Sequence, residues 1–282
     1  GVVRAIDIVE IAIKKYGAPV YVKHQIVHNP NVVEDVEAQG AITVEKVSEI
    51  PDGSVVVFSA HGSAPEDYKI AKNKNLRIVD ATCPLVTKVH NEAKKYKNEK
   101  KSIILVGHEG HQEVKGTMGQ TDMILYDERK KFPKDKIKNL KNVAVISQTT
   151  LSVNDTAKAI ENIKNVVPGA TVRNDICYAT TNRQDATELL SDLCDLVLVI
   201  GANNSSNCER LKDVAIRKGV PSYLILGPQE IDYKWLKGVQ TVGITSGAST
   251  PEKMVQEVIK AIKPEKVEYV GGPPEDITFK MP

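Results

Sequence analysis

The sequence predicts an α/β fold of three similar units, each with a mainly parallel sheet. Two observations carry this prediction. Short apolar runs return along the chain, and each is followed by a polar loop and then by a helical pattern. Continuous apolar runs that alternate with helices are typical of parallel strands covered on both faces. The runs lie at residues 55–58, 78–79, 103–106, 143–146, 196–200, 223–226 and 242–244.

The first element is an amphipathic helix, because apolar residues recur at helical spacing with charged residues between them. These apolar residues are Ala5, Ile6, Val9, Ile13 and Tyr16. The Gly-Ala-Pro run at 17–19 ends the helix, and residues 19–23 are predicted to form a strand. An α/β domain usually has a strand and loop before its first helix. We therefore expect a short preceding segment that supplies a further metal ligand.

The units follow one another without a low-complexity linker. Breaks are expected near Pro84, Ile176 and Pro264, where the strand-and-helix pattern restarts or stops. The predicted divisions are a first α/β unit over 1–83, a second over 84–175, a third over 176–263 and a C-terminal tail over 264–282.

Composition excludes several classes of protein. The 282 residues are 41% hydrophobic and 26% charged, which is ordinary for a globular protein that buries a sizeable core. The net charge is only +2 and no basic block stands out, so neither a nucleic-acid partner nor a membrane partner is expected. Four cysteines are too few for a disulfide framework and suit a reducing compartment or a metal site.

Polar loops follow the predicted strands. They lie at residues 59–62, 107–111, 147–150, 201–207 and 245–249. In open parallel sheets, ligands bind outside the carboxyl ends of the strands. The sequence therefore predicts one polar site that several sheets share.

The loop that ends in Ser205, Ser206 and Asn207 indicates an anion site. It lies between a strand and a helix that is expected to begin near Cys208. Backbone N–H groups and the dipole at a helix start favour an anion, and the hydroxyls add donors. Ordinary N-capping is the simpler alternative, but a cap needs one such residue. A second loop, ending at Ser249, repeats the pattern, and the two together suit a phosphate or diphosphate.

Cys83 and Cys177 are the candidate metal ligands. Neither belongs to a C-x-x-C pair, so the fold must bring any shared ligands together. Structural zinc takes four ligands and an iron–sulfur cluster commonly takes four cysteines, so two thiolates leave the set incomplete. Cys194 is instead expected to be a small apolar residue. Cys208 lies one residue beyond the proposed phosphate loop, and it is not taken as a ligand because its surroundings indicate a helix start.

Three of the six histidines, His28, His61 and His111, lie at strand ends or in turn-rich loops. They are candidates to donate hydrogen bonds to an anionic ligand. His24 and His90 fall within element patterns and are expected to be packing or surface residues. The spacing of His108, His111 and Glu113 resembles a metal-ligand set, but the neighbouring glycines favour a flexible loop.

Glu113 and Thr149 are candidates for acid–base chemistry. We interpret Glu113 as an acid–base group beside the anion, although a surface carboxylate is the simpler reading. Thr149 is placed to hydrogen-bond a substrate hydroxyl, and capping of a helix near Val153 is the alternative.

Six motifs, in order along nearly the whole chain, resemble those of the IspH/LytB family of 4-hydroxy-3-methylbut-2-enyl diphosphate reductases. Any one motif would be weak, whereas six in order are specific. They are Asp-Ala-Thr-Cys-Pro-Leu-Val-Thr-Lys-Val-His at 80–90, Gly-His-Glu-Gly-His-Gln-Glu at 107–113 with Gly-Thr-Met-Gly at 116–119, Ser-Gln-Thr-Thr-Leu-Ser at 147–152, Asp-Ile-Cys-Tyr-Ala-Thr-Thr-Asn-Arg-Gln at 175–184, Asn-Ser-Ser-Asn at 204–207 and Gly-Ile-Thr-Ser-Gly-Ala-Ser at 243–249.

The resemblance implies a reductase that converts 4-hydroxy-3-methylbut-2-enyl diphosphate to isopentenyl and dimethylallyl diphosphate, the last step of the methylerythritol phosphate route to isoprenoids. It implies three α/β units around a central 4Fe–4S cluster held by three cysteines. Cys83 and Cys177 match two ligand positions, and the third is expected just upstream of Gly1. This leaves one iron free to bind the allylic hydroxyl of the substrate.

The resemblance also assigns roles to the candidate residues. Glu113 matches a residue that supplies protons to the hydroxyl, and Thr149 matches a threonine that orients it. The residues that match the diphosphate-binding positions are His28, His61, His111, Ser205, Ser206, Asn207 and Ser249.

The expected partners are the diphosphate substrate and an electron donor of the ferredoxin or flavodoxin type. A monomer is the default expectation, in the cytoplasm of a bacterium or the plastid stroma of a eukaryote. Two other classes stay open from the residues alone. One is a zinc-dependent hydrolase or lyase that acts on a phosphorylated molecule, with Cys83, Cys177 and a histidine as ligands. The other is a non-catalytic module that binds a phosphate ligand.

Overall fold

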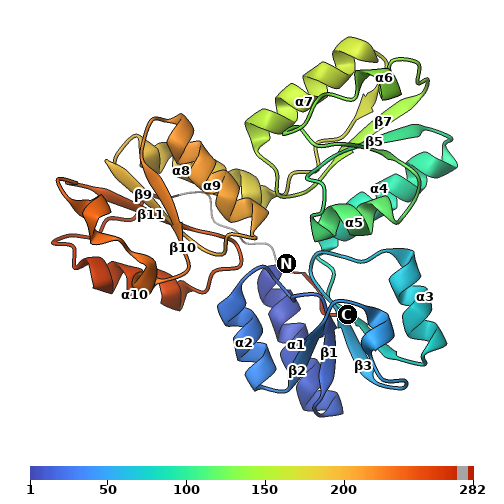
Figure 1. The fold of residues 1–282 in the computed structure, drawn as a ribbon, viewed down its shortest axis with the longest axis horizontal. Coiled ribbons are helices and arrows are strands. Elements are labelled where there is room, and N and C mark those ends of the chain that lie inside the picture. Colours follow the sequence, from blue (N-terminus) through green and yellow to red (C-terminus); the bar gives the residue numbers. More distant parts are fainter. Residues whose placement is uncertain (272–278) are drawn as a thin grey trace. The chain divides into compact units, whose positions relative to one another are not determined.

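The computed structural model describes residues 1–271 and 279–282 and contains three parallel sheets with helices packed on them (Figure 1). The predicted α/β class with three sheets is confirmed. The chain forms two compact units, and two of the sheets belong to the first. The first unit holds Gly1–Val27, Asn31–Ile176 and Thr278–Pro282, and the second holds His28–Pro30 and Cys177–Ile277.

The first sheet has the strand order β2-β1-β3-β4, with every neighbouring pair parallel. Its strands are β1 (Val20–Lys23), β2 (Ala41–Val44), β3 (Val55–Phe58) and β4 (Arg77–Asp80). Helix α1 (Val2–Tyr16) precedes the first strand. The strands are then connected by α2 (Pro30–Ala38), the short 3-10 turn η1 (Val47–Glu49) and α3 (Pro65–Asn73).

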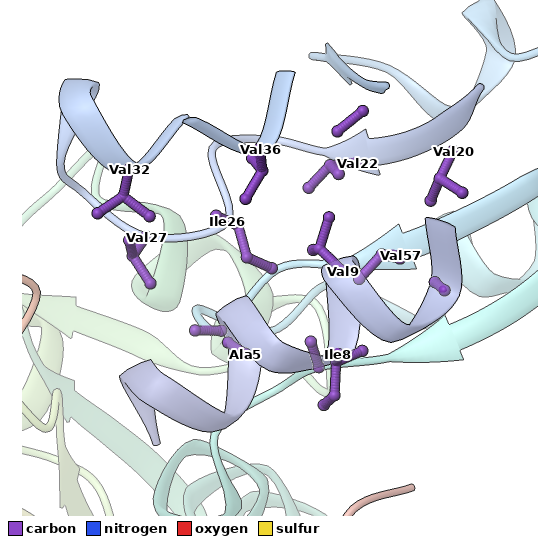
Figure 2. Packing of buried hydrophobic residues seen from close by; sticks show 14 residues of the cluster. Ala5, Ile8, Val9, Val20, Val22, Ile26, Val27, Val32, Val36 and Val57 are labelled. Carbon is purple, nitrogen blue, oxygen red and sulfur yellow. The ribbon is translucent and has the colours of Figure 1, made fainter. Parts of the chain in front are cut away.

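The core of this sheet is built by the apolar face that the sequence predicts for the first helix. Ala5, Ile8 and Val9 of α1 point toward β1 and β3, where they contact a layer of valines (Figure 2). The valine-rich strands fit this arrangement because β-branched side chains pack well on a pleated surface. A buried side chain of this size contributes about 1.5–3 kcal/mol, so this layer fixes the position of the loops at the strand ends.

The second sheet, also in the first unit, has the order β6-β5-β7-β8 and is again parallel. Its strands are β5 (Ser102–Val106), β6 (Ile124–Tyr126), β7 (Val143–Ser147) and β8 (Thr171–Val172). The associated helices are α4 (Pro84–Asn98), α5 (Gln112–Met118), α6 (Lys134–Ile137) and α7 (Val153–Val166).

The third sheet makes up the second unit, with the order β10-β9-β11. Its strands are β9 (Leu196–Ile200), β10 (Ser222–Ile225) and β11 (Val242–Ser246). Its helices are α8 (Tyr178–Ser191), α9 (Ser206–Arg217) and α10 (Glu252–Ile262), with 3-10 turns η2 (Pro228–Glu230) and η3 (Tyr233–Leu236). Central β9 is fully buried, as its run of five apolar residues requires.

Each sheet lies inside one of the three predicted residue ranges, and the exact boundaries stay a prediction. In the predicted tail, residues 264–271 form no helix or strand, and 272–278 lie outside the described residues. Arg4 Nε donates to the Lys280 carbonyl at 2.7 Å, which joins the chain end to α1. No helix in the described part of the chain has the length and apolar character to cross a membrane.

Candidate functional site

Glu113 and Thr149 form a buried hydrogen-bonded pair in the first unit. Glu113 lies in the first turn of α5, and Thr149 follows the carboxyl end of β7. The Thr149 backbone N–H donates to Glu113 Oε1 at 2.7 Å, and the Thr149 hydroxyl donates to Oε2 at 2.8 Å. Glu113 is only 2% exposed, so the reading of it as a surface carboxylate is wrong.

The carboxyl group of Glu113 is held in a protonatable state. Burial raises its pKa from 4.5 to about 7, although both hydrogen bonds from Thr149 act in the opposite direction. The buried carboxyl of Asp175 raises it further. A group with a pKa near neutrality can both give and accept a proton at physiological pH, which is what a general acid requires.

The pKa of Glu113 predicts how stability depends on pH. Because the folded state holds this proton more tightly than the unfolded state, stability falls as the pH rises from about 4.5 to about 7. The rise in pKa corresponds to about 3 kcal/mol. We expect urea unfolding to show that Glu113→Gln becomes more stable relative to the wild type as the pH rises from about 4.5 to about 7. The expected relative gain in the free energy of unfolding is about 3 kcal/mol. A difference that does not change with pH would contradict the assignment.

The alternative role for Thr149 as a helix cap is also wrong. Helix α7 begins at Val153, and its N-cap is Ser152, whose hydroxyl accepts from the Asp155 N–H at 3.2 Å. The Thr149 hydroxyl is therefore left for Glu113.

His111 is fixed as the N-cap of α5. Its Nδ1 accepts a hydrogen bond from the Glu113 backbone N–H at 3.2 Å. Because Nδ1 acts as the acceptor, the proton of the neutral ring lies on Nε2. His111 can therefore present its Nε2–H as a donor. The hydrogen bond at its Nδ1 holds the backbone of Glu113 and so helps to position the Glu113 carboxyl.

The backbone of α5 lies close to the loop that follows β3, and this brings His61 next to His111. A Cβ atom at Gly116 of α5 would lie 3.0 Å from the carbonyl oxygen of Gly62, so this position favours glycine. The contact presses α5 against the loop that follows β3. The rings of His61 and His111 lie edge to face there, with their centroids 6.2 Å apart. The structure thus brings together four predicted site residues of the first unit: His61, His111, Glu113 and Thr149.

His24 was missed as a member of this group. It was expected to be a packing or surface residue, but its ring lies 6.0 Å from that of His61. The signal that could have revealed it is its place at the end of β1, next to β3 in the sheet. The expectation is correct for His90, which is buried and whose pKa is lowered to about 4, chiefly by burial.

The second unit carries the other predicted diphosphate residues. His28 and Ser249, which are 221 residues apart, meet there: the Ser249 hydroxyl donates to the His28 carbonyl at 3.2 Å. The Asn29 amide donates to the Ser249 carbonyl at 2.8 Å. The segment His28–Pro30 is therefore fixed to the loop that follows β11.

The Ser205–Asn207 run lies at the start of α9. Ser205 is the N-cap and accepts from the Cys208 N–H at 3.5 Å, so capping does account for this residue. The helix begins at Ser206, two residues before the expected start. Asn207 is 5% exposed, and neither side-chain amide atom has a hydrogen-bond partner among the described residues. Unpaired buried polar atoms are costly, and at a helix N-terminus the Asn207 Nδ2–H₂ group is placed as a donor that an anionic ligand could use.

Cys208 lies between the loop that follows β9 and the loop that follows β11. A Cβ atom at Gly201 would lie 2.3 Å from Cys208 Sγ, and one at Gly247 would lie 2.2 Å from it. The thiol thus fills the space between the ends of β9 and β11. Burial raises its pKa, which keeps it as a neutral thiol. Cys208 is fully buried and packs as a small apolar residue.

We expect Gly247→Ala to damage this arrangement. Its methyl group cannot coexist with the thiol, so the loop must shift, at a cost of about 1–3 kcal/mol in unfolding free energy. Weaker binding of inorganic pyrophosphate, measured by calorimetry, is expected to accompany the loss. Cys208→Ala removes the clashing atom, so Gly247→Ala should cost less in that background. Additive effects of the two substitutions would contradict the contact.

Cys83 is the N-cap of α4, followed by Pro84 at the first helical position. Its N–H donates to the Ala60 carbonyl at 3.0 Å, which ties it to the His61 loop. Arg4 holds the preceding loop by donating to the Thr82 carbonyl at 3.2 Å. The Gly1 backbone also lies against this sulfur, since a Cβ there would be 2.7 Å from Cys83 Sγ.

Cys177 is likewise an N-cap, that of α8 in the second unit. Its Sγ donates to the Thr180 hydroxyl oxygen at 3.2 Å. The start of a helix favours negative charge, which suits the thiolate form that binds metals. Cys83 and Cys177 are partly exposed, as is Cys194, whereas Cys208 is buried. Burial raises the pKa of the Cys194 and Cys208 thiols.

His108 does not join His111 in a metal set. Its Nε2 lies 2.7 Å from Glu128 Oε1, and its N–H donates to the Gln148 side chain. Asp127 is nearby, and the three could in principle hold a cation. However, the Arg129 guanidinium donates to both carboxylate oxygens of Asp127 and brings a positive charge to the place that a cation would take. This arrangement disfavours a metal there.

Comparison with known proteins supports the motif resemblance. The family model described as LytB protein matches residues 1–263. A 4-hydroxy-3-methylbut-2-enyl diphosphate reductase from Glaesserella parasuis is 48% identical, over 100% of this chain and 93% of the relative. One from Ectopseudomonas mendocina is 45% identical with the same coverage of both.

Solved structures agree. The E-1-hydroxy-2-methyl-but-2-enyl-4-diphosphate reductase from Plasmodium falciparum is 36% identical with a TM-score of 0.91, covering 100% of this chain and 91% of that one. A second structure of (E)-4-hydroxy-3-methyl-but-2-enyl diphosphate reductase is 30% identical with a TM-score of 0.68, covering 93% and 94%. With a family match across nearly all of its length, this chain belongs to the LytB protein family.

Proposed function

We propose that the protein reduces 4-hydroxy-3-methylbut-2-enyl diphosphate to isopentenyl and dimethylallyl diphosphate, the terminal step of the methylerythritol phosphate route. Family membership and the names of the relatives support this activity. The observation that carries it is the buried Glu113 carboxyl, which accepts two hydrogen bonds from Thr149 and has a pKa of about 7.

The chemistry explains why such an acid is needed. Loss of the allylic hydroxyl takes two electrons and two protons, and it gives one water and one new C–H bond. Hydroxide is a poor leaving group, so a proton must reach the oxygen as the C–O bond breaks. Glu113 holds a proton for this step, and Thr149 fixes the carboxyl so that it does not rotate away.

The diphosphate needs donors, and the residues proposed for this role follow from the family resemblance. In the first unit, we propose His61 and the Nε2–H of His111. In the second, we propose His28, Ser205, Ser206, Asn207 and Ser249, and the buried amide of Asn207 is the main support. Neutral or cationic imidazoles, hydroxyls and a helix N-terminus all suit an anion.

We propose Cys83 and Cys177 as two ligands of a 4Fe–4S cluster. Their fit rests on two partly exposed thiols, each at a helix N-terminus. When bound, the cluster would supply electrons one at a time and an iron that acts as a Lewis acid toward the substrate hydroxyl. Thr180 could then donate to the Cys177 thiolate, because such hydrogen bonds tune the potential of a cluster.

The remaining proposals follow from the family resemblance. We propose an electron donor of the ferredoxin or flavodoxin type and a monomeric enzyme. The compartment proposed is the cytoplasm of a bacterium, or the plastid stroma if the source is a eukaryote.

The function is tested with the full-length protein purified without oxygen. We expect about four iron and about four sulfide per chain, a visible absorption band, and turnover of the substrate with a chemical reductant. Colourless protein that contains zinc and releases phosphate from the substrate would favour the hydrolase instead. Protein that binds pyrophosphate with no metal and no turnover would favour the binding module.

A further inference from the structure

The strand order of the first sheet places three side chains next to one another at its carboxyl edge. Neighbouring strands are β2, β1 and β3, and Lys23 at the end of β1 pairs with Val44 and Phe58. Glu45, His24 and the His61 loop therefore emerge side by side. The ring centroids of His24 and His61 are 6.0 Å apart with an interplanar angle of 72°, and those of His61 and His111 are 6.2 Å apart at 85°.

The backbone of His24 is unusual. Its φ is +62°, a conformation that few residues other than glycine adopt, while its N–H donates to the Val44 carbonyl at 2.8 Å. The sheet thus holds the residue in place while the left-handed conformation redirects the chain. Such strain, at about 1–3 kcal/mol, persists only where the surroundings determine it, and it is concentrated at functional sites.

The carboxylate of Glu45 fixes the ring of His24. Its two oxygens lie 3.1 and 3.0 Å from His24 Nδ1. A carboxylate accepts but does not donate, so the proton lies on Nδ1. His24 is 15% exposed at its side chain and Glu45 is 64% exposed, so this pair adds little to stability. Its effect is on orientation.

We propose that His24, anchored by Glu45, is a positioning residue that holds the ring of His61 toward the diphosphate, and this rests on the proposed function. The face-to-edge contact restrains His61, whose Nδ1 is otherwise held by Ser59 Oγ at a long 3.4 Å. Glu45 orients the ring of His24, so the contribution of the pair is geometric. His61 in turn restrains His111.

The test uses the full-length protein with its cluster. His24→Asn keeps a residue that tolerates positive φ but removes the ring, and we expect KM to rise about fivefold with kcat within about twofold. The Kd for inorganic pyrophosphate should rise by a similar factor. Glu45→Ala frees the ring and should raise KM about two- to threefold, whereas Glu45→Gln still accepts from Nδ1–H and should stay within about twofold of the wild type.

Lys23→Gln is the matched control. It removes an ion pair, with Asp67 at 3.7 Å, from the same strand end and should leave KM, kcat and Kd unchanged. Unchanged KM and pyrophosphate Kd in His24→Asn would overturn the proposal, as would a loss of kcat and melting temperature without a KM effect. Wild-type protein that binds pyrophosphate but does not reduce the substrate would refute the proposed function, and the Kd comparison would still decide the role of His24.

Discussion

Glu113→Gln is expected to reduce reductase turnover by about 10²–10⁴-fold while KM stays within about threefold of the wild type. Glutamine matches the shape of the side chain, and its amide oxygen can still accept from the Thr149 N–H, but it has no acidic proton to give. Steady-state kinetics on the anaerobically prepared, full-length enzyme would measure both constants.

The pH profile provides the control for this substitution. Because the proton on Glu113 is lost as the pH rises through about 7, kcat of the wild type should fall above that pH. The residual activity of Glu113→Gln should lack this transition. Near-normal turnover in a variant that retains its iron would show that the proton comes from another group.

Cys83→Ser and Cys177→Ser should each lose most of the iron and reduce activity by at least about a hundredfold, because a serine oxygen is a poor substitute for thiolate at an iron–sulfur cluster. Iron and sulfide analysis, together with the visible spectrum, would measure the effect directly. The proteins should still fold, since both side chains are partly exposed and contribute little to the core.

Cys194→Ser is the matched control for these two variants. Cys194 donates to the Leu190 carbonyl at 3.0 Å, which a serine hydroxyl can also do. We expect full iron content and full activity in this variant. Normal iron in Cys83→Ser, or equal losses in all three variants, would contradict the assignment of Cys83 and Cys177 as ligands.

The central strands and the edge strands β4, β10 and β11 could be predicted from the sequence, whereas the edge strands β2, β6 and β8 could not. Strands β5, β7 and β9 are almost wholly buried, so their apolar runs are unbroken. Strands β6 and β8, at the edges of the second sheet, have only three and two residues and are partly exposed. Edge strands need no continuous apolar run, because one side of each lacks a neighbouring strand.

In the candidate site, too, local motifs could be predicted from the sequence, whereas contacts between distant residues could not. The motifs identified Glu113 and Thr149, but their spacing alone favoured a surface carboxylate and a helix cap. Only folding reveals that α5 and the end of β7 meet, 36 residues apart, and bury the acid. His24 was missed for a similar reason, since the positioning role proposed for it depends on the strand order that places it beside His61.

The most direct test is product analysis by mass spectrometry after the full-length, iron-loaded enzyme and a reductant act on the substrate in deuterium oxide. Reductive dehydroxylation predicts isopentenyl and dimethylallyl diphosphates, each carrying one deuterium on carbon, with the diphosphate intact. Release of inorganic phosphate, or unchanged substrate from protein that holds its full iron and sulfide, would contradict the account.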